Sequence, residues 1–370
     1  MEERLQAVVL VGGEGTRLRP LTYGTPKPMV PIFGVPFLER TLSRLKHAGI
    51  DEVILAAGYL PQAIRDHFGD GSRLGMRLTY VVESEPLGTA GALKNVEEHI
   101  TGPFFVLNGD VLTSLDLRKM MDFHQRTGGV GALHSIRVDD PSAFGCIVHD
   151  DRSRITSFVE KPPRETAPTN EINAGTYLLS REVLDAIPAG RNVSIERETF
   201  PALIAAGASL YIYGTDDYWI DIGRPEHYLR AHRDVLDGRL RLDPLADPER
   251  NGGRLWLRGD VDVPEGIRVP AFVADGASLS PGAVIGPHAV LGERVIVGPG
   301  AKIALSVVWD DAVIEGGAQI LGSILADGVR VGRNAYVHDG TVVGHEAEIA
   351  AETVVEPHSR IVAEPAVAQA

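Results

Sequence analysis

The 370-residue sequence contains a single cysteine, Cys146, so the chain cannot form an internal disulfide bond. It also lacks the thiolates that a structural zinc site built from four cysteines, or from two cysteines and two histidines, requires. No apolar run approaches the ~20 residues of a membrane-spanning helix, and the N-terminal stretch MEERLQAVVLVGG does not follow the signal-peptide pattern. These absences favour a cytoplasmic protein with no membrane partner.

Basic residues are scarce as well, above all toward the C-terminus. The formal net charge of -14 at pH 7 argues against nucleic acid as a partner. Between residues 259 and 370, 15 acidic side chains stand against 6 basic ones, and Lys302 is the single lysine. An anionic ligand is therefore expected to bind the earlier part of the chain.

The first ~236 residues alternate between apolar runs typical of buried strands and segments with helical periodicity. The expected strands are 7–11, 53–57, 78–82 and 104–107, and the expected helices are 36–47, 61–68 and 89–98. This alternation predicts an α/β domain over residues 1–236, with a mostly parallel sheet and ligands at the carboxyl ends of its strands. Residues 237–258, rich in proline, glycine and charge, are predicted to be a linker.

A different period governs residues 259–370, the predicted second domain. Aliphatic residues recur every six positions in two series, and the register slips between Ile303 and Val331. The members are Val273, Leu279, Ile285, Leu291, Val297 and Ile303, then Val331, Val337, Val343, Ile349, Val355 and Ile361. Hexapeptides of this kind are typical of a parallel β-helix, here of about five coils; a β-sandwich would instead alternate every two residues. Bare end coils favour a homo-oligomer.

A glycine-rich loop, GGEGTR at 12–17, follows the first expected strand. It matches neither the GxxxxGK[ST] nor the GxGxxG pattern, but its glycines allow close backbone approach to phosphates. Arg17 and Lys27 lie ten residues apart in a stretch that the prolines at 20, 26, 28 and 31 stiffen. Two cations in a rigid loop suit a triphosphate.

The longer string GGEGTRLRPLTYGTPKPMVPI at 12–32 resembles the signature of the sugar-nucleotide pyrophosphorylases, or NDP-sugar nucleotidyltransferases. The resemblance extends through LGTAGAL at 87–93, LNGD at 107–110, VEKP at 159–162, NAG at 173–175 and WIDIG at 219–223. It implies a Rossmann-like nucleotidyltransferase domain followed by a left-handed parallel β-helix. Together with the other motifs, SIERETFP at 194–201 is most similar to the branch that uses GTP and mannose 1-phosphate.

The resemblance also implies site residues. Arg17 and Lys27 would hold the β- and γ-phosphates, Lys161 would hold the sugar phosphate, and Asp110 and Asp221 would bind Mg²⁺. The implied nucleotide-binding residues are Gly12, Gly13, Gly15, Thr16, Glu85, Gly88 and Thr89, and the implied sugar-binding residues are Gly145, Glu160, Asn173 and Gly175. The acceptor for the guanine N–H groups stays open between Glu83 and Glu85.

Two other functions remain as alternatives. One is a glucose-1-phosphate uridylyl-, thymidylyl- or adenylyltransferase; the other is a non-catalytic regulatory homologue that binds an NDP-sugar. The presence of the phosphate-binding and metal-binding residues argues against the second. Cys146 is expected to be a buried residue and not a nucleophile. The four histidines of the tail are expected at the surface or at an interface: His288, His338, His345 and His358.

Overall fold

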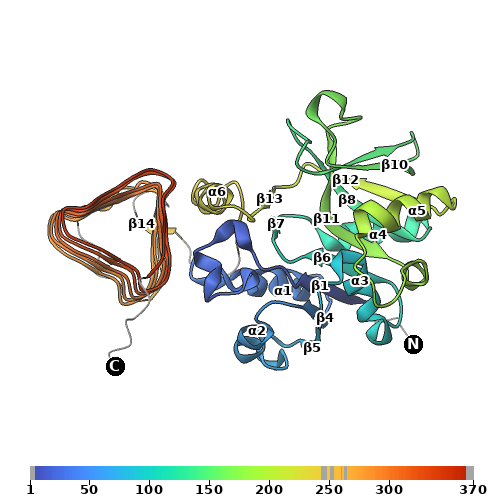
Figure 1. Ribbon diagram of the computed structural model, residues 1–370, viewed down its shortest axis with the longest axis horizontal. Helices are drawn as coiled ribbons and strands as arrows, with labels where there is room; N and C mark the ends of the chain where they lie inside the picture. Colours follow the sequence, from blue (N-terminus) through green and yellow to red (C-terminus); the bar gives the residue numbers. More distant parts are fainter. Residues whose placement is uncertain (1–4, 243–247, 251–253, 260, 262–264, 364–370) are drawn as a thin grey trace. The chain divides into compact units, whose positions relative to one another are not determined.

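The computed structural model (Figure 1) describes residues 5–242, 248–250, 254–259, 261 and 265–363. The chain divides into two compact units, each described here by itself. The first comprises Met1–Glu14 and Thr41–Trp219, and the second comprises Gly15–Arg40 and Ile220–Ala370. This division differs from the predicted domains, 1–236 and 259–370, because the glycine- and proline-rich loop groups with the C-terminal strands.

A nine-stranded sheet forms the centre of the first unit. Strand β1 (Gln6–Val11) lies between β4 (Glu52–Ala57) and β6 (Phe104–Asn108), and β5 (Arg77–Val82) follows β4. These four strands are mutually parallel, and the four predicted strands lie within them. Most of their apolar side chains are buried, as expected when helices cover both faces of a sheet, whereas Val82 at the end of the outermost strand β5 is exposed.

The later strands turn the same sheet into a mixed one. They are β8 (Gly131–Arg137), β9 (Gly145–His149), β10 (Ile155–Glu160), β11 (Glu171–Leu179) and β12 (Leu210–Gly214). Strand β11 pairs antiparallel with β6 and β8, whereas β12 pairs parallel with β8. Three further short strands are β2 (Pro31–Ile32), β3 (Val35–Pro36) and β7 (Val111–Thr113), and β13 covers Trp219–Asp221.

The α-helices of the described residues are short. They are α1 (Phe37–His47), α2 (Pro61–Phe68), α3 (Gly88–Asn95), α4 (Leu117–Thr127), α5 (Phe200–Ala205) and α6 (Pro225–Leu236). The prediction of a helix over 89–98 is wrong at its end, because Val96 leaves the helical conformation and a 3-10 turn follows at Glu97–His99. None of the described helices is long and apolar enough to cross a membrane.

The C-terminal strands of the second unit form a left-handed parallel β-helix with triangular coils (Figure 1). One side is the sheet of β15 (Leu255–Leu257), β16 (Ala271–Val273), β19 (Ala289–Leu291), β22 (Val307–Val308), β25 (Ile324–Leu325), β28 (Val342–Val343) and β31 (Arg360–Ile361), to which β14 (Pro248–Arg250) adds antiparallel. The second side holds β17 (Ser278–Leu279), β20 (Ile296–Val297), β23 (Val313–Ile314), β26 (Arg330–Val331) and β29 (Glu348–Ile349). The third holds β18 (Val284–Ile285), β21 (Lys302–Ala304), β24 (Gln319–Leu321), β27 (Tyr336–Val337) and β30 (Val354–Val355).

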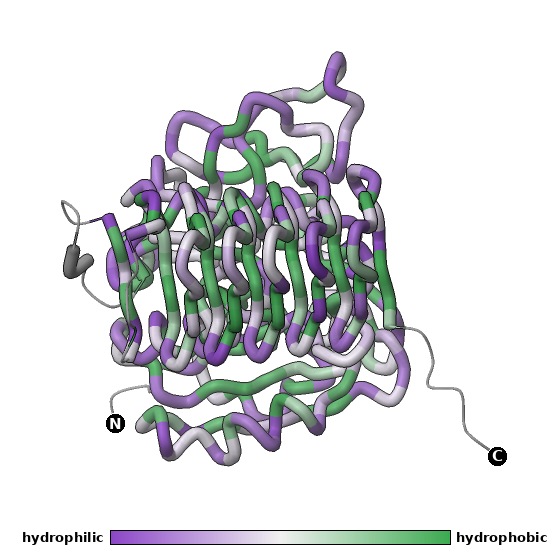
Figure 2. The backbone as a smooth tube through the Cα atoms, turned by 90° about the vertical axis from the view of Figure 1, so that its left-hand side faces the viewer, coloured by the Kyte–Doolittle hydropathy of each residue, from purple (hydrophilic) through white to green (hydrophobic). Residues whose placement is uncertain are grey.

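The aliphatic residues of the hexapeptides fill the interior of these coils, and hydrophobic segments recur from coil to coil in Figure 2. The register slip has a local cause. Ile285 pairs with Ile303, 18 residues on, but Ile303 pairs with Ile320 and Ile320 with Val337, 17 residues on in each case. The missing residue in each coil falls at the corner between the third and first sheets, where Ser306 and Ser323 are buried and the Ser323 N–H donates to Ser306 Oγ at 3.1 Å.

The predicted linker, 237–258, needs one correction. Leu255–Leu257 form β15, which pairs in parallel register with β16 and buries its side chains. The β-helix sheet therefore begins inside the range predicted as a linker, because an apolar LWL triplet can occupy a coil position without a complete hexapeptide. Residues 243–247 and 251–253 lie outside the described residues.

Candidate active site

Three charged side chains of the second unit surround Gly223. A Cβ atom built on Gly223 would lie 2.7 Å from Oδ1 of Asp221, 2.8 Å from Nη2 of Arg17 and 3.2 Å from Nζ of Lys27. The predicted phosphate-binding cations and one predicted metal ligand therefore converge on a point that only a glycine leaves open. The Gly223 N–H donates to Asp221 Oδ1 at 2.6 Å, which fixes the carboxylate there.

The loop that carries these cations is built from short 3-10 turns, at Thr16–Leu18, Leu21–Tyr23 and Lys27–Met29. Gly15 has a φ of 64°, in the left-handed region that favours glycine. Thr22 Oγ1 donates to the Gly15 carbonyl at 2.9 Å, which ties the start of the loop to its middle. Lys27 is only 9% exposed, so its position is set by packing and not by solvent.

The glycines at the start of the loop have different surroundings. A Cβ on Gly13 would meet no atom within 4 Å, so its backbone is open to an approaching group. Gly12 lies against Gly58, since a Cβ on Gly58 would be 2.9 Å from the Gly12 carbonyl oxygen. Gly12 is therefore packed closely against Gly58, whereas Gly13 has free space beside its backbone; that both bind the nucleotide stays a prediction. Thr16 and Arg17 are exposed.

The predicted base-binding segment, 87–93, opens helix α3. Gly88 has a φ of 69°, and a Cβ there would lie 2.6 Å from the Val193 carbonyl oxygen. Glu83 Oε2 accepts from the Leu87 N–H at 3.1 Å, and burial raises the pKa of Glu83. Glu83 thus anchors the segment, whereas Glu85 is exposed and presents the other candidate carboxylate.

Asp110 follows β6 in the string LNGD. The Gly109 N–H donates to the Leu10 carbonyl at 3.0 Å, and a Cβ on Gly109 would clash with that oxygen. The glycine therefore lets the chain after β6 approach the end of β1, which places Asp110 beside the strand that leads into the glycine-rich loop. Asp110 is half-buried.

The predicted sugar-phosphate residues lie at the end of β10. Lys161 Nζ lies 3.3 Å from Glu160 Oε1, and Lys161 has a φ of 49°, which is unusual for a residue with a side chain. Gly145 pairs with Glu160 across the β9–β10 ladder. A Cβ on Gly145 would lie 2.6 Å from the Phe158 ring and 2.8 Å from Glu160 Oε2, so the absence of a side chain at Gly145 leaves room for both of these side chains.

One hydrogen-bonded chain joins a predicted sugar-binding residue to a predicted nucleotide-binding residue through Tyr177 and Glu196, to which the sequence had assigned no role. Asn173 Nδ2 donates to the Tyr177 hydroxyl at 2.7 Å, and that hydroxyl donates to Glu196 Oε1 at 3.3 Å. Thr89 Oγ1 donates to Glu196 Oε2 at 2.9 Å. Glu196 belongs to SIERETFP at 194–201, the string that resembles the branch using GTP and mannose 1-phosphate and to whose residues the sequence assigned no individual role.

A glycine and an asparagine complete this part of the site. Gly175 has a φ of 72°, and a Cβ there would lie 2.6 Å from Asn108 Nδ2. The Gly175 N–H donates to Asn173 Oδ1 at 3.1 Å, so both termini of the Asn173 amide are held. Asn108 Oδ1 is buried without a hydrogen-bond partner among the described residues, at the end of β6.

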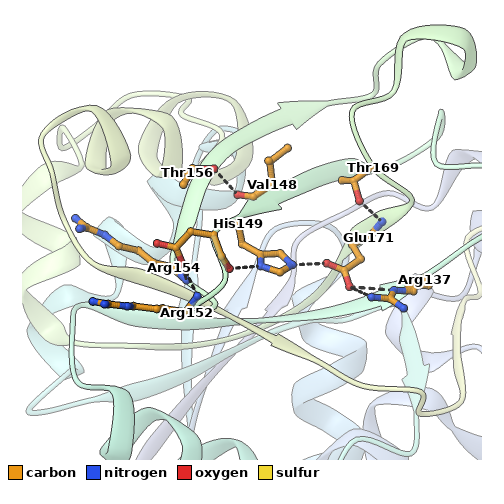
Figure 3. Close-up of polar contacts among 9 residues, drawn as sticks. Arg137, Val148, His149, Arg152, Arg154, Thr156, Thr169 and Glu171 are labelled. Atoms are coloured by element: carbon orange, nitrogen blue, oxygen red, sulfur yellow. Dashed lines mark hydrogen bonds and ion pairs between the residues drawn. The ribbon is translucent and has the colours of Figure 1, made fainter.

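An ion-pair network joins the ends of three neighbouring strands close to Asn173 (Figure 3). Glu171 accepts from Arg137 Nε at 3.0 Å and lies 2.8 Å from His149 Nε2, while His149 Nδ1 contacts the Asp150 carbonyl at 2.8 Å. The Asp150 carbonyl and then Glu171 raise the pKa of His149, because both favour the charged ring. The network clamps β8, β9 and β11 together, the last two of which carry Gly145 and Asn173.

Cys146 is fully buried and donates its S–H to the Thr169 carbonyl at 3.4 Å, as expected for a structural residue. Burial raises the pKa of its thiol, which disfavours a nucleophilic thiolate. Two β-helix histidines are paired: His288 Nε2 lies 2.8 Å from Asp237 Oδ1, and His345 Nδ1 lies 3.3 Å from Asp327 Oδ2.

Taken together, the α/β sheet with its glycine-rich loop and the attached β-helix define a nucleotide-binding enzyme architecture. Residues 6–238 match the family described as nucleotidyl transferase, and residues 267–367 match the family described as GMPPB C-terminal domain. The mannose-1-phosphate guanylyltransferase of Mycobacterium tuberculosis is 41% identical over 319 residues, which cover 86% of this chain and 83% of that protein. The chain therefore belongs to the nucleotidyl transferase family, which confirms the resemblance.

Other proteins are also similar to this chain in sequence or in fold. Mannose-1-phosphate guanylyltransferase 1 of Arabidopsis thaliana is 41% identical over 246 residues, 65% of this chain and 67% of that protein. Among solved structures, HddC from Yersinia pseudotuberculosis complexed with GMP-PN has a TM-score of 0.54 at 33% identity, covering 62% of this chain and 99% of that one. A putative glucose-1-phosphate thymidylyltransferase from Bacillus anthracis has a TM-score of 0.58 at 23% identity, over 64% of this chain and 97% of that one, and shows the shared fold.

Proposed function

We propose that the protein transfers a guanylyl group from GTP to mannose 1-phosphate, forming GDP-mannose and pyrophosphate. The observation that carries this proposal is the convergence of Arg17, Lys27 and Asp221 on Gly223. Two cations beside a carboxylate at an open glycine suit a polyphosphate that arrives with a divalent cation. The names of the relatives in Mycobacterium tuberculosis and Arabidopsis thaliana support guanine and mannose over the alternatives.

The chemistry needs alignment and charge neutralisation more than a protein base. A phosphate oxygen of the sugar phosphate, already anionic, attacks the α-phosphorus of GTP. The new O–P bond forms as the bond to the bridging oxygen of the β-phosphate breaks, and pyrophosphate leaves with that electron pair. Arg17 and Lys27 would neutralise the departing pyrophosphate, while Lys161 would hold the attacking sugar phosphate.

Mg²⁺ fits the donor set that the chain offers. Asp110 and Asp221 would supply hard carboxylate oxygens, and Mg²⁺ usually takes only one or two of these with substrate phosphates and water. The described residues contain no group of three or more histidine, cysteine, aspartate or glutamate side chains arranged to hold a metal alone. When bound, Mg²⁺ would stabilise the charge that develops on the phosphates.

The substrate assignment can be tested with a panel of GTP, UTP, dTTP and ATP against mannose and glucose 1-phosphates, followed by pyrophosphate release. We expect GTP with mannose 1-phosphate to have the highest kcat/KM. Glu85→Gln should lower the preference for GTP over ATP about tenfold, because it removes a charged acceptor for the guanine N–H groups.

Glu83→Gln is the matched control for this panel. It alters the carboxylate that accepts from the Leu87 N–H, so it should affect all four nucleotides to a similar degree. A wild-type preference for UTP, dTTP or ATP with glucose 1-phosphate would contradict the proposed substrates. An unchanged GTP preference in Glu85→Gln, with a lowered one in Glu83→Gln, would move the guanine contact to Glu83.

We also propose that the chain self-associates through its β-helix, as its stacked coils leave strand edges at the ends. Light scattering of the full chain would then report a mass well above the 39.8 kDa of one copy. A mass of one chain at micromolar concentration would contradict this.

A further inference from the structure

The β-helix carries a column of acidic residues on one corner. Glu293, Asp310 and Asp327 each lie two residues after a strand of the first sheet, in three successive coils. The Glu293 N–H donates to Asp310 Oδ1 at 2.7 Å, and the Asp310 N–H donates to Asp327 Oδ1 at 3.2 Å. In the next coil the same position, two residues after β28, is His345. A histidine thus ends the column where another carboxylate would be repelled.

His345 reaches in two directions. Its Nδ1 lies 3.3 Å from Asp327 Oδ2, and its Nε2 lies 3.0 Å from the Leu21 carbonyl oxygen. Both of these oxygens can only accept hydrogen bonds, so the ring satisfies them together only when both nitrogens carry a hydrogen. The hydrogen bond to Asp327 accordingly raises the pKa of His345, with smaller contributions from Leu21 and Glu346, although burial opposes this.

The Leu21 end of this contact belongs to the loop that carries the phosphate-binding cations. His345 Nε2 also lies 3.2 Å from Thr25 Oγ1, so one ring contacts the loop at two points between Arg17 and Lys27. The backbone at the neighbouring Gly344 is close as well, since a Cβ there would lie 3.0 Å from Pro20 Cβ.

A second anchor on the same face holds the end of this loop. Trp309 Nε1 donates to the Tyr228 hydroxyl at 3.0 Å, and that hydroxyl donates to the Pro31 carbonyl. The Trp309 ring lies 5.5 Å from the His345 ring, centroid to centroid. The β-helix therefore contacts the loop directly through His345 and Gly344, and it reaches Pro31 indirectly, through the hydrogen bond from Trp309 to Tyr228 of α6.

We propose that His345, held by Asp327, is a positioning residue for the triphosphate: it fixes Leu21 and Thr25, and through them the loop that presents Arg17 and Lys27. The β-helix then acts on catalysis directly, by ordering one substrate-binding loop, in addition to any role in assembly. The proposal deepens the proposed function and rests on it. It requires that loss of the Nε2 contact raises the KM for GTP. The KM for mannose 1-phosphate, which residues on other strands would hold, should not change.

Two substitutions in the full-length protein separate the two ring nitrogens. The amide of Gln reaches the place of Nε2 and can donate to the Leu21 carbonyl, whereas the amide of Asn reaches only the place of Nδ1. We expect His345→Asn to raise the KM for GTP about tenfold with the KM for mannose 1-phosphate within twofold, and His345→Gln to restore the KM for GTP to within about threefold of the wild type. His338→Asn is the control, since His338 lies on the β-helix with its ring beside Tyr336.

An unchanged KM for GTP in His345→Asn, an equal rise for both substrates, or an equal defect in the Gln and Asn variants would overturn the proposal. Should His345→Asn fail to fold, Asp327→Asn removes the carboxylate that holds the ring and is expected to raise the KM for GTP selectively, by a smaller factor.

If the wild type turns over no nucleotide and sugar-phosphate pair, the proposed function fails. The affinity for inorganic tripolyphosphate, measured by calorimetry, then tests the role of His345 independently of turnover. Weaker binding by His345→Asn than by His345→Gln supports that role, and equal binding overturns it.

Discussion

Asp110→Asn and Asp221→Asn are each expected to lower kcat on the order of 100-fold or more while leaving the fold intact. Carboxylates are the ligands that Mg²⁺ prefers, and an amide oxygen carries no charge to offset that of the metal. Asp221 also lies beside Arg17 and Lys27 around Gly223. Its neutralisation removes an anion next to two cations, so Asp221→Asn should not weaken GTP binding to the same extent as it lowers kcat.

The measurement is a pyrophosphate-release assay over a range of Mg²⁺ concentrations, with circular dichroism to check the fold. Chelation of the metal should abolish wild-type activity, and added Mg²⁺ should restore it. Asp151→Asn, on an exposed turn, makes the same chemical change and should leave activity unaltered. Near-normal Mg²⁺-dependent turnover in both Asp110→Asn and Asp221→Asn would rule out their assignment as metal ligands.

Lys27→Ala and Lys161→Ala are expected to impair opposite substrates. Lys161, which lies beside Glu160 at the end of β10, should chiefly affect the KM for mannose 1-phosphate. Lys27, which lies beside Asp221 and Arg17, should chiefly affect the KM for GTP and, in the reverse direction, the KM for pyrophosphate. Each variant loses a charge-assisted contact of roughly 1.5–3 kcal/mol, which corresponds to about 10- to 100-fold.

Initial rates with each substrate varied in turn separate these effects. Lys302→Ala, which removes an exposed lysine of the β-helix, is the control for the change in charge. Kinetic defects of the same pattern in Lys27→Ala and Lys161→Ala would contradict the division of roles. Lys27→Arg keeps the positive charge and should retain part of the GTP binding that Lys27→Ala loses.

The parts of the fold that follow from periodicity could be predicted from the sequence. Buried parallel strands have continuous apolar runs, which is why β1, β4, β5 and β6 were found where expected. The β-helix follows from its hexapeptides, because the interior of each coil accepts only aliphatic or small side chains. The antiparallel strand β11 was not predicted, since pairing direction depends on the chain's path between strands and leaves no local pattern in the sequence.

Long-range contacts account for most of what sequence reasoning missed. The slip between Ile303 and Val331 was visible, but its cause, two coils of 17 residues shortened at the same corner, required the strand register. The link between Thr89 and Asn173 runs through Glu196, more than 100 residues from Thr89. His345 was expected at a surface or interface, and its contact with Leu21 spans 324 positions. No local spacing rule predicts such pairs.

For glycines, the motif alone does not show which neighbouring atoms require the missing side chain. Gly145 was predicted as a sugar-binding position, which stays a prediction, and the structure shows in addition that its missing Cβ makes room for Phe158 and Glu160. Gly223 attracted attention only as part of WIDIG, yet it is the position around which Arg17, Lys27 and Asp221 gather. A sequence indicates that a glycine is required, whereas the neighbouring atoms show which group requires it.

The transfer itself is tested most directly by following the phosphorus atoms of GTP. The full-length protein would be incubated with Mg²⁺, mannose 1-phosphate and GTP labelled with ³²P at either the α- or the γ-position. Attack of the sugar phosphate at the α-phosphorus predicts that the α-label enters GDP-mannose and that the γ-label leaves as pyrophosphate, both only when mannose 1-phosphate is present. Release of the γ-label as inorganic phosphate, or an α-label that never reaches a sugar nucleotide, would contradict the account.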